Sequence, residues 1–254
     1  MNEIDIAPIL AIAIEAGQGI LKVYHDLAQD FQITSKKDHS PLTAADQLAH
    51  DIIMKGLTAL HPDIPVLSEE GAEIAYEIRK DWPLYWCVDP LDGTKEFISR
   101  NGEFTVNIAL MANNEPVMGV IYSPVLNLIY YGSLRDGSFK MIPGGPAERI
   151  FVAKEKGNWK AIGSRSHADP EEEEVLKEFP VTDKLAIGSS LKFCFIAEGK
   201  AHIYYRKGPT MEWDTAAGQA IAVSAGATML NNLKEKFLYN KPSLLNPGFF
   251  CYCS

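Results

Sequence analysis

The sequence contains few cysteines, and their positions match no common pairing or metal-binding pattern. Only four occur among 254 residues. Their spacing is neither that of a disulfide framework nor that of a zinc site, and the last two alternate as they would on one face of a strand. We therefore expect ordinary reduced thiols at Cys87, Cys194, Cys251 and Cys253.

Basic residues are outnumbered by acidic ones. The chain has 24 lysines and arginines against 33 aspartates and glutamates, a formal net charge of −9. Such a chain repels a nucleic-acid backbone, so we expect no nucleic-acid polymer as a partner. A small anionic substrate stays open, because bound cations can invert the local field.

Long apolar runs and targeting signals are also missing. No stretch approaches the ~20 apolar residues that cross a bilayer. The chain starts with Glu3 and Asp5 instead of the positively charged region of a signal peptide. The expectation is a cytoplasmic protein without a transmembrane segment.

Several catalytic motifs are absent as well. We find no G-x-S-x-G or Ser-His-Asp arrangement, no Walker A motif and no G-x-G-x-x-G. The six histidines are scattered and form no zinc-type cluster with cysteine. Phosphate chemistry on this chain would therefore be hydrolysis by a metal-activated water.

What is present predicts alternating helices and strands around a sizeable core, since 46% of the residues are hydrophobic. Apolar periodicity predicts helices at residues 4–26, 43–60, 169–179, 191–197 and 213–225. Strands are predicted at 66–68, 84–88, 105–111, 116–123, 128–132, 138–142, 161–163, 185–188, 201–206 and 249–252, with an antiparallel meander from residue 105.

A Pro-Gly-Gly-Pro segment at residues 143–146 is the best candidate hinge between two halves. We predict an N-terminal α+β half over residues 1–145 and a C-terminal α/β half over residues 146–254. Strand-like and helix-like stretches alternate in the second half, which favours a layered α/β architecture.

The stretch DPLDGTKEF at residues 89–97 is the chemical centre of the sequence. It follows an apolar run that reads as a buried strand. Asp89 and Asp92 stand three residues apart with the stiff Pro90 between them, Gly93 permits close approach of the backbone, and Thr94 offers a hydroxyl. Carboxylates followed by free backbone N–H groups suit hard cations and a phosphate together.

Further carboxylates fall at the ends of other predicted elements. Each has a structural alternative: a helix cap, a solvated loop, a turn or a partner for a helix dipole. Together, however, acids gathered around one strand end would repel one another unless cations neutralised them. Mg²⁺ does so with oxygen ligands and keeps waters for a phosphate substrate. The candidates are Asp46, Glu69, Glu70, Asp89, Asp92 and Asp214.

Two of these stretches resemble the signatures of a known family. DPLDGT at 89–94 is similar to the D-P-x-D-G-T signature of the inositol monophosphatase superfamily, and WDTAAG at 213–218 resembles its W-D-x-A-A-G signature. Glu69-Glu70 and Asp46 match the other acidic positions. Residues 40–46, 95–107, 164–169 and 188–194 are similar to the bacterial 3'(2'),5'-bisphosphate nucleotidases of that superfamily.

The resemblance implies an αβαβα sandwich with a substrate cleft between its halves. It also implies a Mg²⁺-dependent, lithium-sensitive phosphatase of sulfur metabolism. The expected reaction converts adenosine 3',5'-bisphosphate to AMP and phosphate, with 3'-phosphoadenylyl sulfate as a plausible second substrate.

Carried over by position, the resemblance implies two Mg²⁺ ions and leaves a third, weaker one open. Glu69, Asp89 and the carbonyl of Leu91 would hold the first ion, and Asp89, Asp92 and Asp214 the second. Glu69 would also contact the third.

The remaining implied roles concern water and substrate. Asp46 and Thr94 would form the catalytic pair that orients the attacking water. The N–H groups of Gly93 and Thr94 would receive the phosphate, and Lys192 and Arg206 could hold the 5'-phosphate. The expected substrate-binding residues are Glu69, Leu91, Asp92, Gly93, Thr94, His167, Ser189, Lys192, Arg206 and Asp214.

Other functions compete with this hypothesis. An inositol monophosphatase is the nearest alternative, and a fructose 1,6-bisphosphatase is a weaker one. A non-catalytic phosphate or metal sensor would need the ions but no pair that orients water. The sequence leaves the oligomeric state open, and the resemblance leaves peripheral association with the inner membrane open.

Overall fold

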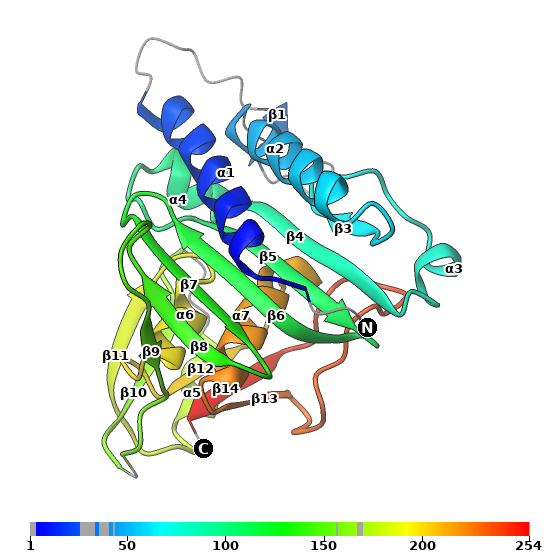
Figure 1. The fold of residues 1–254 in the computed structure, drawn as a ribbon. Coiled ribbons are helices and arrows are strands. Elements are labelled where there is room, and N and C mark those ends of the chain that lie inside the picture. Colours follow the sequence, from blue (N-terminus) through cyan, green and yellow to red (C-terminus); the bar gives the residue numbers. More distant parts are fainter. Residues whose placement is uncertain are drawn as a thin grey trace.

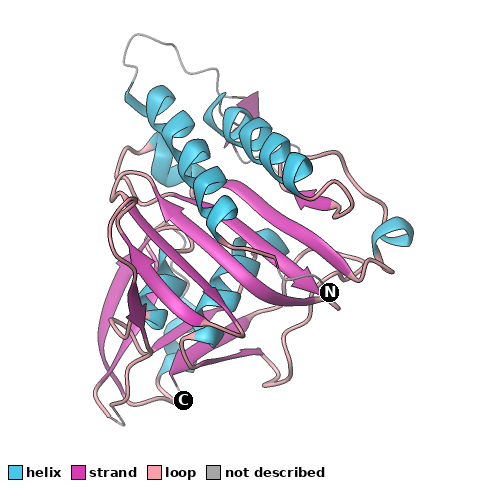
Figure 2. Ribbon diagram, in the orientation of Figure 1, coloured by secondary structure: helices cyan, strands magenta, loops and turns pink. Residues whose placement is uncertain are grey.

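The chain folds into five alternating layers of helices and sheets (Figures 1 and 2). The computed structural model describes residues 4–25, 34–35, 41–42, 44–155, 157–166 and 170–253. Helices α1 and α2 cover the outer face of a seven-stranded sheet, α6 and α7 lie between this sheet and a five-stranded one, and α5 contacts the second sheet. The predicted αβαβα sandwich is therefore confirmed.

The outer helices are amphipathic, as predicted. Helix α1 (Ala7–His25) and helix α2 (Ala44–Leu60) pack against each other and against the strands beneath them. Their buried faces carry side chains such as Ile9, Ile20 and Ile53, which join the core of the first sheet. By length and composition α1 could also cross a membrane, but half of the residues in its apolar window are buried inside the protein. The same helix therefore reads as a core element of this fold.

The seven-stranded sheet follows the predicted meander. Its first two strands are parallel, and each later strand pairs antiparallel with the one before it (Figure 1). The strands are β3 (Val66–Ser68), β4 (Leu84–Asp92), β5 (Thr105–Ala112), β6 (Glu115–Ser123), β7 (Leu128–Ser133), β8 (Gly137–Met141) and β9 (Glu148–Ile150). Two short helices, α3 (Tyr76–Arg79) and α4 (Thr94–Ile98), flank β4 in sequence, and β1 (Thr34–Ser35) pairs with β2 (Pro41–Leu42).

The five-stranded sheet is mixed and runs in the order β11-β10-β12-β14-β13. Its strands are β10 (Trp159–Ser164), β11 (Val181–Ile187), β12 (Ile203–Arg206), β13 (Ala227–Asn231) and β14 (Phe249–Cys253). The helices of this part are α5 (Pro170–Leu176), α6 (Leu191–Ala197) and α7 (Glu212–Ser224). The predicted helix at 169–179 is shorter than expected, because the chain after Leu176 continues in tight turns instead of helix.

The chain passes from one sheet to the other between Ile150 and Trp159. One hydrophobic cluster includes residues of both sheets, with Tyr85 and Ile121 from the first and Tyr204 and Phe249 from the second. The predicted division at residues 145 and 146 stays a prediction.

Helix α7 lies close against the first sheet because small residues line the contact. Ala216, Ala217 and Ala220 are buried. At Gly119 on β6, an added Cβ would come within 2.4 Å of the Ala217 carbonyl oxygen. This close approach fixes the height of α7 above the sheet, and with it the helix end that reaches the site.

All four cysteines are buried and free, which confirms the reduced-thiol prediction. Cys251 and Cys253 lie on β14, as the alternation indicates. Burial raises the pKa of each thiol, most strongly for Cys87 and Cys194. These thiols act as small core residues.

Candidate active site

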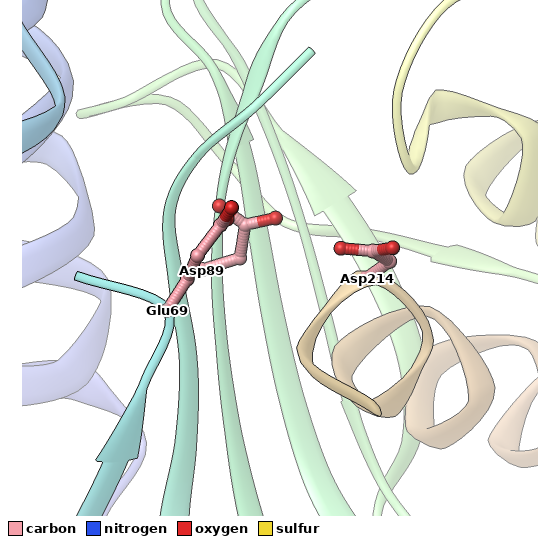
Figure 3. Close-up of side chains that lie close together, drawn as sticks. All are labelled: Glu69, Asp89 and Asp214. Carbon is pink, nitrogen blue, oxygen red and sulfur yellow. The ribbon is translucent and has the colours of Figure 1, made fainter. Parts of the chain in front are cut away.

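Three carboxylates from different elements converge at one point. Glu69 follows β3, and its backbone N–H donates to the Val88 carbonyl at 3.1 Å, which places it beside β4. Asp89 lies on β4 and is buried, and Asp214 is in the first turn of α7. One carboxylate oxygen of each lies within 4.8 Å of the others, and the Asp214 carboxylate faces the other two across a small gap (Figure 3).

The irregular end of β4 explains why two aspartates three residues apart can serve one site. Asp89 pairs with Asn107 on β5, whereas Asp92 pairs with Thr105, so β4 contains one extra residue between these pairs. The bulge occupies Pro90 and its neighbour, and a bulge is a position where proline, which lacks an N–H, is tolerated in a sheet. The N–H of Leu91 turns back to donate to the Asp89 carboxylate at 3.1 Å.

Asp92 is half-buried and is held by neighbouring donors. Its carboxylate accepts from Ser190 Oγ at 2.6 Å and from Asn107 Nδ2 at 3.3 Å. Burial raises the pKa of Asp92, and the Lys192 ammonium and these two hydrogen bonds oppose that increase. Asp92 thus stands next to the cluster of Glu69, Asp89 and Asp214 and lines the same cleft.

Asp214 is fixed by the backbone around it. Its carboxylate accepts from the Met211 N–H at 2.7 Å, and its carbonyl accepts from Ser190 Oγ at 2.9 Å. Burial raises the pKa of Asp214 well above its usual range, and the nearby charges of Asp92 and Glu69 raise it further. An acid in this position favours a bound cation or a proton.

The donor set fits a hard divalent cation. The three converging groups are all carboxylates, which suit Mg²⁺, whereas zinc in proteins usually takes nitrogen or sulfur ligands. Burial, and after it the charges of Asp92 and Glu69, raise the pKa of Asp214, and a bound cation would oppose both effects. These residues therefore fit a hard divalent cation.

A cleft of about 460 Å³ opens from the carboxylates. That volume lies in the usual range for small-molecule sites. Asp89 and most of the predicted substrate-binding residues line it: Glu69, Leu91, Asp92, Gly93, Thr94, Ser189, Lys192, Arg206 and Asp214. An apolar wall is formed by Pro209, Met211, Trp213 and Leu245.

Two basic side chains lie in this cleft despite being almost fully buried. Lys192 Nζ donates to the Ser189 carbonyl at 2.5 Å and lies 5.5 Å from the centre of the Tyr204 ring. Burial lowers the pKa of Lys192, and the Asp92 carboxylate opposes that shift. Arg206 Nη1 lies 3.5 Å from the Glu172 carboxylate, so part of its charge is balanced from helix α5.

The remaining predicted residues include the proposed water-orienting pair, two residues with positive φ and one histidine. Asp46 is buried in the first turn of α2, and Thr94 begins α4 at the mouth of the cleft. Gly93 has φ of +95°, a conformation that glycine adopts without strain, and Ser189 has φ of +49°. His167 lies outside the described residues.

The sequence patterns did not single out several residues of the site. Asn107 and Ser190 hold Asp92, and Ser166 Oγ donates to the buried Glu96 carboxylate at 2.6 Å beside the cleft. Asn107 and Ser190 both lie in stretches that carry the resemblance. Short polar residues on buried strands or helix starts carry no periodic signal of their own, so only their three-dimensional neighbours reveal their role.

Comparison with known protein families shows to which family the chain belongs. The inositol monophosphatase family matches residues 2–248, nearly the whole chain. The chain belongs to this family. Its two signature motifs supply Asp89 and Asp214, and the fold brings these carboxylates together with Glu69.

Relatives of this family member include well-matched bacterial proteins. The 3'(2'),5'-bisphosphate nucleotidase CysQ of Salmonella typhimurium is 50% identical over 94% of this chain and 95% of its own. The protein of the same name from Escherichia coli K12 is 48% identical over 94% of this chain and 95% of its own. A crystal structure of CysQ from Bacteroides thetaiotaomicron is 44% identical, covers 97% of this chain and 96% of its own, and superposes with a TM-score of 0.85.

Proposed function

We propose that the chain is a Mg²⁺-dependent 3'(2'),5'-bisphosphate nucleotidase that converts adenosine 3',5'-bisphosphate to AMP and phosphate. The observation that carries this proposal is the high identity, over nearly the full length, to relatives with that name. The carboxylates Glu69, Asp89 and Asp214, which converge in one cleft, support it independently.

In this reaction a water oxygen attacks the phosphorus, and the bond between phosphorus and the 3'-oxygen breaks. When bound, Mg²⁺ would supply Lewis-acid activation and neutralise phosphate charge. Glu69, Asp89, the Leu91 carbonyl, Asp92 and Asp214 would hold two ions, and Glu69 would also contact a third.

Residues of the chain would also orient the reactants. We propose that Asp46 accepts a hydrogen bond from the Thr94 hydroxyl and that this pair positions the attacking water. The N–H groups of Gly93 and Thr94 would donate to the phosphate oxygens. Positioning and charge neutralisation then provide most of the rate enhancement, as is usual for phosphoryl transfer.

The other end of the substrate would lie toward the two buried cations. We propose that Lys192 and Arg206 contact the 5'-phosphate, with Ser189 and His167 as further contacts. These contacts with a second phosphate would favour nucleotide bisphosphates over inositol monophosphates, which lack one. The sulfated nucleotide 3'-phosphoadenylyl sulfate would present its anionic group at the same place. We also propose that the chain acts in the cytoplasm.

A substrate panel tests the proposal. Phosphate release with Mg²⁺ is measured from adenosine 3',5'-bisphosphate, 3'-phosphoadenylyl sulfate, inositol 1-phosphate and fructose 1,6-bisphosphate. The bisphosphate nucleotide should have the highest kcat/KM. A preference for inositol 1-phosphate or for the fructose ester would overturn the assignment, and no release from any substrate would favour a sensor.

The role of Lys192 needs a comparison that separates substrate contact from damage to the site. The readout is the ratio of kcat/KM for adenosine 3',5'-bisphosphate to that for adenosine 3'-phosphate. Lys192→Met should lower this ratio by roughly 10- to 150-fold, because a lost charge-assisted contact is worth roughly 1.5–3 kcal/mol. The control is Lys184→Met on β11, whose ammonium pairs with Glu173 at 2.9 Å on the surface. Equal losses for both substrates would show that Lys192 only supports the structure.

A further inference from the structure

A buried polar network connects helix α3 to the start of α7. Arg79, at the end of α3, is only 2% exposed. Its Nη1 donates to Asn240 Oδ1 at 2.7 Å, and its Nη2 donates to the carbonyls of Lys241 at 2.7 Å and Pro242 at 3.1 Å. The guanidinium therefore fixes three consecutive residues of the segment 239–246, which connects β13 to β14.

Asn240 is the centre of this network. Its Nδ2 donates back to the Arg79 carbonyl at 2.8 Å and to Asn114 Oδ1 in the β5–β6 turn at 3.0 Å. Its own N–H donates to the Glu212 carboxylate at 2.7 Å. The backbone at Asn240 has φ of +56°, which asparagine tolerates better than most residues. Asn240 thus links α3 and the β5–β6 turn to the start of α7.

Glu212 is the acidic end of the network and is completely buried. Besides the Asn240 N–H, it accepts from the Lys241 N–H at 3.1 Å and from Lys241 Nζ at 2.5 Å. A buried carboxylate with these donors is anchored, because moving it would leave charge and N–H groups unpaired at a high cost. Glu212 is the first residue of α7 and lies two positions before Asp214.

The same segment also contains Asn246, which binds Met211, the residue whose N–H donates to Asp214. Asn246 Nδ2 donates to the Met211 carbonyl at 2.6 Å, and the Met211 N–H donates to the Asp214 carboxylate at 2.7 Å. The Glu212 N–H donates to the Leu244 carbonyl at 3.0 Å. Hydrogen bonds with the 239–246 segment therefore fix the first turn of α7, and hydrogen bonds from Arg79 fix that segment.

We propose that Arg79, Asn240 and Glu212 form a positioning network that holds Asp214 at ion-binding distance from Glu69 and Asp89. The reason lies in the connectivity. Asp89 belongs to the first sheet, whereas Asp214 belongs to a helix between the sheets, and their carboxylates repel each other until an ion binds. Arg79 lies in the connection between β3 and β4, and Asn114 lies in the β5–β6 turn. Both are joined directly to strands of the first sheet, so the network resists the separation that this repulsion favours. The inference rests on the proposed Mg²⁺ site.

Binding of Mg²⁺ without substrate tests the network directly. Titration calorimetry is performed at a temperature at which circular dichroism shows each variant to be folded. Glu212→Gln and Arg79→Met should each weaken Mg²⁺ binding about tenfold, the effect expected when groups behind metal ligands are removed. Arg79→Lys should recover part of the affinity, since an ammonium can reach the carbonyls but cannot reproduce the planar fork.

The matched control is Glu198→Gln, another buried carboxylate. Glu198 accepts from Tyr130 Oη at 2.9 Å and Lys140 Nζ at 3.0 Å, away from the cleft. The Glu198→Gln variant should have a lower melting temperature than the wild type but the same Mg²⁺ affinity. If Arg79→Met and Glu212→Gln behave like Glu198→Gln, the network is structural only and the inference is wrong.

Two provisions keep the test decisive. If a core variant does not fold, Lys241→Met replaces it, because that side chain is 24% exposed and its loss removes one donor to Glu212. Its Mg²⁺ affinity should fall at least about twofold, and an unchanged value would overturn the inference. Wild-type protein that binds no Mg²⁺ would instead reject the proposed function.

Discussion

At the scale of single residues, the carboxylates of the cleft differ mainly in what surrounds them. Asp92 accepts hydrogen bonds from two side chains, Asp214 accepts one from the backbone, and Asp46 is buried on another element. Burial and like charge raise the pKa of Asp214, whereas hydrogen bonds and Lys192 limit the increase at Asp92. Similar residues can therefore have different roles in one site.

Asp46→Asn is the sharpest single-residue test of catalysis against sensing. The change keeps the size of the side chain but weakens its ability to accept and orient a hydrogen bond, so turnover should fall by about two to four powers of ten. Nucleotide binding, measured by calorimetry with Mg²⁺ present, should be largely retained. Asp51→Asn on the same helix is the control, because Asp51 is exposed and its carboxylate accepts from Gln47 on the same helix. Unchanged turnover would remove Asp46 from the mechanism.

The buried thiols make a second prediction, which concerns pH. Their pKa values are raised by burial, so the thiols stay protonated in the folded protein when an exposed cysteine would already ionise. A raised pKa stabilises the folded state fully below the unfolded value, roughly 8.5, and this contribution is lost as pH rises toward the folded value. The melting temperature should therefore fall from pH 8 to pH 10.

Labelling with a thiol reagent at pH 8 provides the matching measurement. The native protein should react slowly, and four thiols should react after denaturation, since the sequence has four cysteines. Fast labelling of a native thiol would contradict the burial on which this prediction depends.

Much of the candidate site could be predicted from residue types and motif positions. Glu69, Asp89 and Asp214 do converge, and the cleft contains Ser189, Lys192 and Arg206. The network behind them could not be predicted, because Arg79 and Asn240 are 161 positions apart in the chain. A contact at that separation depends on how the layers stack, and no local pattern encodes it.

At the scale of elements, the periodic segments were predicted well, and so were the short β3 and α6, whereas several other short elements were not. Helices α1 and α2 and the meander agree with their apolar patterns. Helices α3 and α4 have four and five residues, and β9 has three, so they are too short to show a period. Strand β4 is longer than its apolar run because the bulge lets Pro90 and Asp92 continue it.

The contact between β6 and α7 provides an element-scale prediction. A Cβ at position 119 would meet backbone atoms of Ala217, which cannot move without shifting the helix that carries Asp214. Gly119→Ala should therefore lower the free energy of unfolding by about 1–3 kcal/mol and weaken Mg²⁺ binding. Chemical denaturation measures the first effect and calorimetry the second. Gly163→Ala on β10 is the control, since nothing lies within 4 Å of its added Cβ.

At the scale of the whole molecule, the carboxylate cluster is a junction between layers. Glu69 and Asp89 belong to the first sheet, and Asp214 belongs to a helix packed between both sheets. An ion bound there would cross-link these layers and replace repulsion with attraction. Folding stability and ion binding should therefore be linked across the molecule.

The final prediction follows from this linkage. Mg²⁺ at about 100 times its Kd should stabilise the folded protein by about 2.7 kcal/mol, seen as a higher melting temperature than with a chelator. The increase should be larger at pH 8 than at pH 5. Without an ion, the raised pKa values of Asp92 and Asp214 stabilise the folded state fully below their unfolded value near 3.9, and this contribution is lost as pH rises through the folded values. Protons therefore compete with Mg²⁺ most strongly at acidic pH.

Asp89→Asn separates this linkage from general salt effects. It removes one of the three converging carboxylates, so the melting temperature without Mg²⁺ should stay the same or rise, as repulsion is relieved. The response to Mg²⁺ should largely disappear, because the remaining carboxylates bind the ion too weakly. NaCl at matched ionic strength should not reproduce the wild-type increase, since screening acts mainly on exposed charges, and Asp89 is buried while Glu69 and Asp214 are half-buried. An equal response to Mg²⁺ in the wild type and in Asp89→Asn would mean that the ion stabilises the molecule elsewhere, and the layers would then not be joined at this cluster.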